Sequence, residues 1–162
     1  MRKHSLTRVT VGLSVALLLS LVTMPSMAEQ HDHHDVSGLE LQLNAGQKWQ
    51  TDAPLRQAMS NIGQTINTAL DDIHNNQLDA AGYAAIAEHV NQQVAYMIEN
   101  CQLDAQADAQ LHIVLARLID SAQRMQKHSD VKEKRQGAVQ LLGALNNYAT
   151  YFNDEDFVKP VH

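Results

Sequence analysis

The chain has 162 residues, with 12 basic and 18 acidic side chains, so its net charge is −6 when histidine is neutral. A chain of this length suits one domain, and an acidic chain is poorly suited to nucleic acid or anionic lipid, which carry the same sign of charge. Cys101 is the single cysteine, so no disulfide forms within the chain.

Residues 1–28 have the layout of a secretory signal peptide. Three basic residues precede an uncharged, apolar run from 9 to 24, and Ser26 and Ala28 are small residues at the positions that a signal peptidase reads. The run is short for a membrane span, which needs about 20 residues, and an uncleaved anchor is the alternative. We expect cleavage after Ala28, export to the periplasm and no stable membrane span afterwards.

Cleavage after Ala28 would remove 28 of the 162 residues and leave 134. It would also remove three of the 12 basic side chains, so that 9 would face 18 acidic ones and the net charge would be −9. Residues 29 to about 46 are mostly polar, with one apolar patch at Leu39, Leu41 and Leu43 that alternates with polar residues as in a short strand. Because the sequence offers no second strand, we expect residues 29–50 to form an extended, histidine-bearing arm.

Residues 51–157 have the periodicity of four helices, and residues 158–162 would form a C-terminal tail. Thr51 or Asp52 would cap the first helix, Asp79 the second, and Asp130 with Glu133 resembles a capping box for the fourth. Apolar residues recur at steps of three and four. The four stripes are Leu55, Met59, Ile62, Ile66, Ala69 and Ile73; Tyr83, Ile86, Val90, Val94, Met97 and Cys101; Leu111, Leu115, Leu118, Ala122 and Met125; and Val131, Ala138, Leu141, Leu145, Tyr148 and Phe152.

The short connections predict an all-α fold, an up-down-up-down antiparallel four-helix bundle. In that arrangement Met59, Met97, Cys101 and His112 would converge on one end of the core. Thioether, thiolate and imidazole form the ligand set expected for copper, Cu(I) especially, with or without the thiol. The alternative is that both methionines and the cysteine are packing residues, and that His112 is simply hydrogen-bonded.

The amino terminus that cleavage would create reads Glu29-Gln30-His31. Its free amine, two backbone amides and the His31 imidazole can place four nitrogens in one plane, the geometry suited to Cu(II) or Ni(II). His33 and His34 add further donors, and Zn(II) could also use such a cluster. The alternative is a solvated tail without a role in metal binding.

Three stretches of the chain read "GQKWQTDAPLRQAM", "NCQLDAQADAQLHIVLARL" and "GAVQLLGALNNYATYF". Together they resemble a family of small exported bacterial proteins, some of them labelled DnrO-like, over about residues 39–157. The resemblance implies a periplasmic helical protein in which Trp49, Met59, Cys101 and His112 match positions of the family's pattern. It implies no particular activity.

Catalytic patterns are absent from the sequence. No nucleophile elbow occurs, and no Glu-x-x-His pair recurs as in di-iron bundles. Haem c attachment needs Cys-x-x-Cys-His, and a haem b bundle would need a histidine late in the fourth helix, where Tyr148 and Tyr151 stand.

We therefore expect a non-enzymatic periplasmic metal-binding protein for buffering, delivery or sensing. Copper is the preferred ion, with zinc or nickel as alternatives. A second hypothesis is a metal-free structural protein that presents a helical face to an envelope protein partner. A third is a haem-b-binding electron-transfer bundle that would use Met59.

Overall fold

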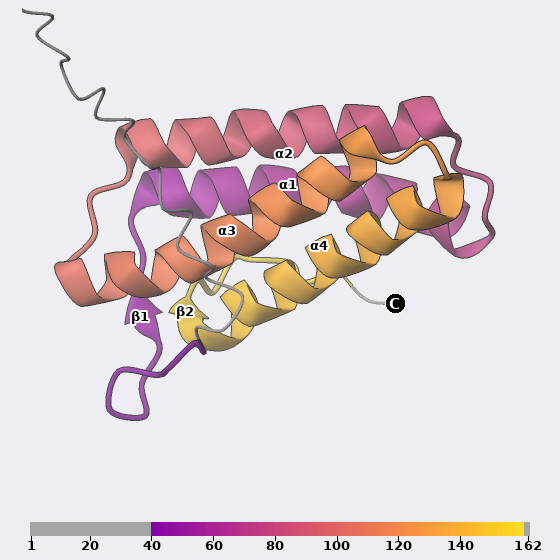
Figure 1. The fold of residues 1–162 in the computed structure, drawn as a ribbon. Helices are drawn as coiled ribbons and strands as arrows, with labels where there is room; N and C mark the ends of the chain where they lie inside the picture. The colour runs from indigo at the N-terminus through magenta and orange to yellow at the C-terminus, as the bar shows by residue number, and fades with distance from the viewer. Residues whose placement is uncertain (1–39, 161–162) are drawn as a thin grey trace, which may run out of the picture. The chain divides into compact units, whose positions relative to one another are not determined.

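The computed structural model describes residues 40–160, which form four long helices and two very short strands (Figure 1). The helices are α1 (Ala53–His74), α2 (Ala80–Asn100), α3 (Ala105–Lys127) and α4 (Val131–Tyr151), and the strands are β1 (Trp49–Gln50) and β2 (Phe152–Asn153). The predicted all-α class and the four helices are confirmed. The predicted signal peptide and the first part of the predicted arm lie outside the described residues.

Each helix begins immediately after an aspartate. Asp52, Asp79, Asp104 and Asp130 have extended backbones, and their side chains accept hydrogen bonds of 2.7–3.0 Å from N–H groups of the first turn. An aspartate there satisfies an unpaired N–H and places a negative charge at the positive end of the helix dipole. The sequence interpretation found three of these caps and took the segment around Asp104 only as a break.

The predicted capping box of α4 is half wrong. Asp130 is the N-cap, but the carboxylate of Glu133 accepts a hydrogen bond of 2.6 Å from Nη2 of Arg124 on α3. The long guanidinium of a neighbouring helix competes with the local backbone N–H for Glu133, and spacing along one helix cannot reveal that competition.

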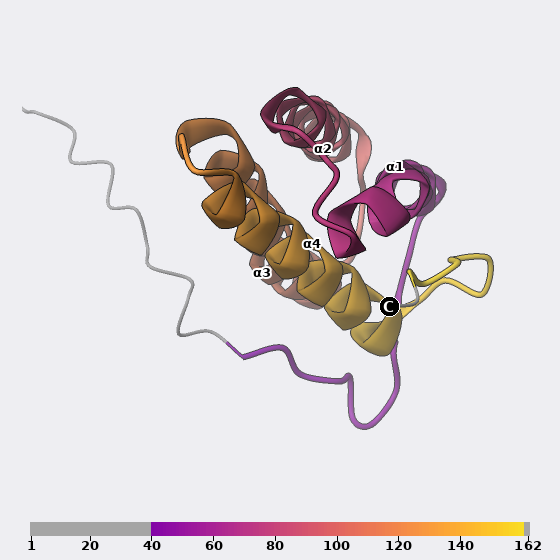
Figure 2. The same cartoon turned by 90° about the vertical axis from the view of Figure 1, so that its right-hand side faces the viewer.

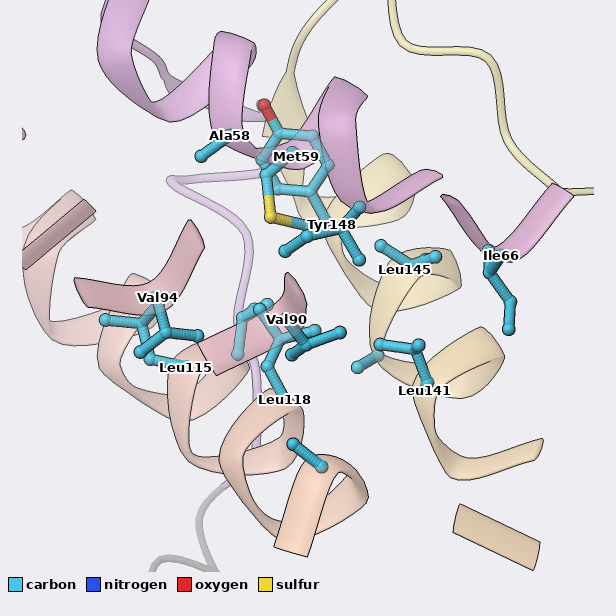
Figure 3. Packing of buried hydrophobic residues seen from close by; sticks show 14 of the residues in the cluster. Ala58, Met59, Ile66, Val90, Val94, Leu115, Leu118, Leu141, Leu145 and Tyr148 are labelled. Carbon is cyan, nitrogen blue, oxygen red and sulfur yellow. The ribbon is translucent and has the colours of Figure 1, made fainter. Parts of the chain in front are cut away.

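The predicted apolar stripes form the core. Figure 3 shows Met59, Val90, Leu118, Leu145 and other side chains from the four helices pointing into one shared interior. The exception is Val131, whose side chain remains 43% exposed at the start of α4. No helix within residues 40–160 is both long enough and apolar enough to span a membrane.

Consecutive helices pack against each other, and α3 lies closest to α4. Gly137 permits this approach, because a Cβ there would lie 2.8 Å from Cγ of Met125 and 2.9 Å from the carbonyl oxygen of Ser121. The α3–α4 pair runs obliquely to the α1–α2 pair in two perpendicular views (Figures 1 and 2).

The expectation of no paired strand is wrong for Trp49. β1 and β2 are parallel, with Trp49 opposite Phe152 and Gln50 opposite Asn153. Two residues per strand are too few for an alternating pattern to stand out, so this pair could not be predicted from the sequence. The pairing ties the segment before α1 to the segment after α4.

Residues 40–48 lie against α3 and α4. The backbone N–H of Gln42 donates to Oε1 of Gln110 (2.8 Å), and Nζ of Lys48 donates to the carbonyl oxygen of Ala149 (2.7 Å). Leu41 is buried, whereas Leu43 is 42% exposed. These contacts fix the described part of the predicted arm on the helical domain.

The segment after β2 returns to α1. The ring of Phe157 lies 3.3 Å from the position that a Cβ on Gly63 would take, and the hydroxyl of Tyr148 donates to Oδ2 of Asp154 (2.7 Å). Tyr148 also stacks on Phe152 and meets Phe157 edge to face, at centroid distances of 5.4 and 5.1 Å.

Candidate functional site

Asp52 caps α1 and also binds the segment that directly follows α2. Its Oδ1 accepts from the N–H of Leu55 (2.9 Å), and its Oδ2 accepts from the N–H of Gln102 (2.6 Å). The thiol of Cys101, the C-cap residue of α2, donates a further hydrogen bond to the same carboxylate. One aspartate therefore holds the start of α1, the end of α2 and the single cysteine together.

The surroundings of Cys101 keep its thiol protonated. Its pKa is raised to about 12, chiefly by burial and further by the negative charge of Asp52, the hydrogen bond to Asp52 and the charge of Asp108. The thiolate is both the nucleophile and the metal ligand. Cys101 is thus a poor nucleophile at neutral pH, and a cation that bound its sulfur would have to displace the proton.

His112 lies on the outer face of α3. Its side chain is 65% exposed, and its Nδ1 lies 2.9 Å from the carbonyl oxygen of Asp108 and 3.4 Å from Oδ2 of the same residue. Asp108 is also one of the two carboxylates that act on Cys101. His112 and Cys101 therefore share Asp108 as an electrostatic neighbour.

Met59 and Met97 are interior residues, at 0% and 1% exposure. In Figure 3 the thioether of Met59 points into the core beside Tyr148. A haem at Met59 would have to displace this packing, and the hydroxyl of Tyr148 is already bonded to Asp154.

The four soft donors predicted to converge occupy three environments: two thioethers in the core, a half-buried thiol and an exposed imidazole. Within residues 40–160 no three histidine, cysteine, aspartate or glutamate side chains are grouped to hold a metal ion. Burial of both methionines is what the packing alternative requires, and a shared copper site stays a prediction.

The second predicted site lies outside the described residues. It comprises Glu29, Gln30, His31, His33 and His34, so its square-planar geometry also stays a prediction. The site depends on the covalent order of the chain after cleavage and needs no folded partner.

Sequence reasoning missed Asp52 and Asp108 as partners of Cys101. It treated Asp52 only as a helix cap and assigned no role to Asp108. The spacing of Asp108 and His112, four residues apart on one helix, was a usable signal for that pair. Asp52 and Cys101 are far apart in the sequence, so no local pattern could reveal that they lie close together in the fold.

Comparison with known proteins adds no relative, since no family model, no curated protein and no solved structure matches this chain. The resemblance to DnrO-like proteins stays a prediction.

Proposed function

We propose that this protein is a non-enzymatic, copper-binding protein of the periplasm, and that its metal ligands are the first residues of the processed chain. The observation that carries the proposal is the order Glu29-Gln30-His31 directly after the expected cleavage site at Ala28. A free amine, two amides and a third-position imidazole suit the square-planar preference of Cu(II). Zn(II) or Ni(II) are the alternative ions.

The chemistry of the helical domain is compatible with a Cu(II) site on the same chain. Thiolates reduce Cu(II) to Cu(I), whereas a thiol reacts far more slowly. Asp52 and Asp108 favour the protonated form of Cys101, and both methionine sulfurs are shielded from solvent. In this proposal the chain carries Cu(II) at its amino terminus, and the helical domain does not reduce it to Cu(I). Buffering, delivery or sensing of Cu(II) requires that the ion is not reduced.

The proposal includes an up-down-up-down arrangement of the helices. The connections between consecutive helices are short, spanning 75–79, 101–104 and 128–130, and such connections favour antiparallel neighbours. An additional Cu(I) site at Met59, Met97, Cys101 and His112 would require His112 to turn inward and Cys101 to lose its proton.

The test uses the protein exported and processed by a bacterial host, with its first residue established by intact mass. Titration with Cu(II) should give one tight equivalent with the visible absorption of a four-nitrogen square-planar complex. His31→Ala should abolish this band, and one extra alanine before Glu29 should abolish it as well, because it moves the amine. His128→Ala, which removes an exposed histidine of the helical domain, is the matched control and should bind normally.

An unchanged Cu(II) equivalent in His31→Ala would exclude the terminal site. Labelling of Cys101 with and without Cu(I) tests the core site separately, and equal labelling would show that the thiol is not a ligand.

A second candidate is a metal-free protein that contacts an envelope protein partner. The observation that favours it is a run of 18 residues without charge, from 136 to 153, covering most of α4. Val139 is 45% exposed on this helix, and Gly143 has no atom within 4 Å of where its Cβ would be. Under this hypothesis His31→Ala leaves function in the cell unchanged, whereas Val139→Glu abolishes it.

A further inference from the structure

The end of the helical domain opposite Cys101 contains a cavity of about 360 Å³. Its lining residues come from the segment after α1 and from the first turns of α2 and α4, which lie at the same end of the helices in Figure 1. Pockets that bind small molecules have volumes of about 300–1,000 Å³, so this cavity can hold a compact one. The residues that line it are Asn76, Tyr83, Val131, Lys132, Arg135 and Gln136.

The lining carries two positive charges, from Lys132 and Arg135, and no carboxylate. Arg135 is held in place, because its Nε donates a hydrogen bond of 3.0 Å to the carbonyl oxygen of Ile73 in the last turn of α1. That bond uses the side of the guanidinium and leaves its two Nη groups as a fork. Such a fork matches a carboxylate, which can accept two parallel hydrogen bonds.

Tyr83 adds a second polar group that points to a ligand. The residue is only 1% exposed, yet it lines the cavity, and its hydroxyl makes no hydrogen bond to any other residue of 40–160. The charge of Arg135 acts on this hydroxyl and lowers its pKa, although burial has the larger effect and raises it. The hydroxyl itself is not sealed from solvent, so it is available to donate a hydrogen bond to an anionic ligand in the cavity.

One wall of the cavity is apolar. Val131 is 43% exposed at the first position of α4, although its place in the sequence pattern predicts burial. With the ring of Tyr83 it offers a surface for a hydrocarbon group, while Asn76 and Gln136 offer amides at the rim. The cavity thus combines a cationic side with an apolar side.

We propose that this cavity binds a small organic monocarboxylate with an apolar body. The carboxylate accepts hydrogen bonds from the Nη groups of Arg135 and the hydroxyl of Tyr83, and Lys132 adds a second positive charge. The apolar body lies against Val131 and the ring of Tyr83. This site is independent of the amino-terminal copper site, and its occupancy does not depend on cleavage after Ala28.

The experiment follows the backbone amides of Val131, Lys132 and Gln136 and the Nε–H of Arg135 by ¹H–¹⁵N NMR in the full processed chain. The probe is benzoate, compared with benzamide, its neutral counterpart of the same shape, and with inorganic phosphate. Benzoate should shift these four signals saturably. Tyr83→Phe should weaken its binding by about tenfold to a hundredfold, the loss expected for one hydrogen bond to a charged group. Lys132→Ala should weaken it by about twofold to fivefold, the loss expected for an exposed charge interaction.

The variants are chosen so that folding does not obscure the result. Tyr83→Phe removes only the hydroxyl, which has no hydrogen bond within residues 40–160, and leaves the buried ring in place. Lys132 is on the surface, so Lys132→Ala should not disturb the fold. Lys159→Ala removes an exposed lysine that does not line the cavity and should bind benzoate as the parent does.

Three results would overturn the proposal. If benzamide binds as tightly as benzoate, the cavity does not select an anion. If phosphate binds as tightly as benzoate, the site is a cationic surface patch without an apolar subsite. No saturable shift, or shifts that Tyr83→Phe and Lys132→Ala leave unchanged, would show that benzoate does not bind in this cavity.

Discussion

Asp52 is the residue that does most to determine the state of Cys101. Its carboxylate takes hydrogen bonds from the thiol and from two backbone N–H groups, those of Leu55 and Gln102. Loss of its charge, with a side chain of the same shape retained, should make the thiol more acidic. The effect of this single residue can be measured through the reactivity of the Cys101 thiol.

We predict that Asp52→Asn lowers the pKa of Cys101 from about 12 and speeds its alkylation by iodoacetamide at pH 8. Reaction requires the thiolate, whose population rises about tenfold for each unit by which the pKa falls. Because a less basic thiolate is also a weaker nucleophile, the rate should rise by about threefold to tenfold per unit. Asparagine still caps α1 well, although its amide nitrogen cannot accept from Gln102. The matched control is Asp79→Asn, which changes the cap of α2 at the other end. Equal rates in both variants would contradict the role assigned to Asp52.

The two glycines of α4 have opposite roles. Gly137 faces α3 at a distance that leaves no room for a methyl group, whereas Gly143 faces open space. The sequence places both inside one helix and does not say which face of the helix each one occupies.

Gly137→Ala should therefore destabilise the protein by about 1–3 kcal/mol, the usual cost of overpacking. Gly143→Ala should stabilise it by about 1 kcal/mol, because alanine is the better helix former and meets no neighbour. Urea unfolding of the two variants measures both effects. Destabilisation by both, or by neither, would show that the α3–α4 contact differs from the one described.

At the scale of elements, sequence reasoning succeeded where the signal is local. Aspartate caps and apolar stripes lie within single helices, so they gave four helices close to their observed bounds. It failed where distant segments meet. The β1–β2 pair joins Trp49 to Phe152, and Glu133 bonds to Arg124 of another helix. The same limit applies to the site, where Cys101 was identified but its partner Asp52 was not.

The segment that follows β2 also depends on contacts between distant parts of the chain. Phe157 packs on Gly63 of α1 and on the edge of Tyr148. Phe157→Ala should cost about 2–3 kcal/mol, somewhat less than the 3–5 kcal/mol typical of a fully buried phenylalanine, because its side chain is only partly buried. Val158→Ala is the control, since Val158 is 74% exposed, and urea unfolding should find it within about 0.5 kcal/mol of the parent. Equal stability of the two variants would mean that the packing of this segment on α1 does not stabilise the fold.

At the scale of the whole molecule, three acidic side chains within residues 40–160 hold their protons more tightly in the folded state. Burial is the largest cause in each case, and it raises the pKa of Cys101 to about 12 and raises those of Tyr148 and Tyr83. The unfolded chain releases these protons near pH 8.5 for cysteine and 10 for tyrosine. Above those values the unfolded state binds fewer protons than the folded state, so the free energy of unfolding falls as pH rises.

We therefore predict that these groups lower the free energy of unfolding progressively as the pH rises from about 9 towards 12. Below about pH 8 they should have no effect on its pH dependence. Cys101→Ala should make the decline between pH 9 and 10 shallower, because the cysteine is the first of the three to titrate in the unfolded chain. Tyr148→Phe should lower stability at pH 7, where it loses the bond to Asp154, yet should reduce the further loss above pH 10. Urea midpoints at pH 7, 9, 10 and 11 separate the two variants. A decline that neither substitution alters would show that alkaline unfolding arises from other groups, the many arginine and lysine contacts at the helix ends among them.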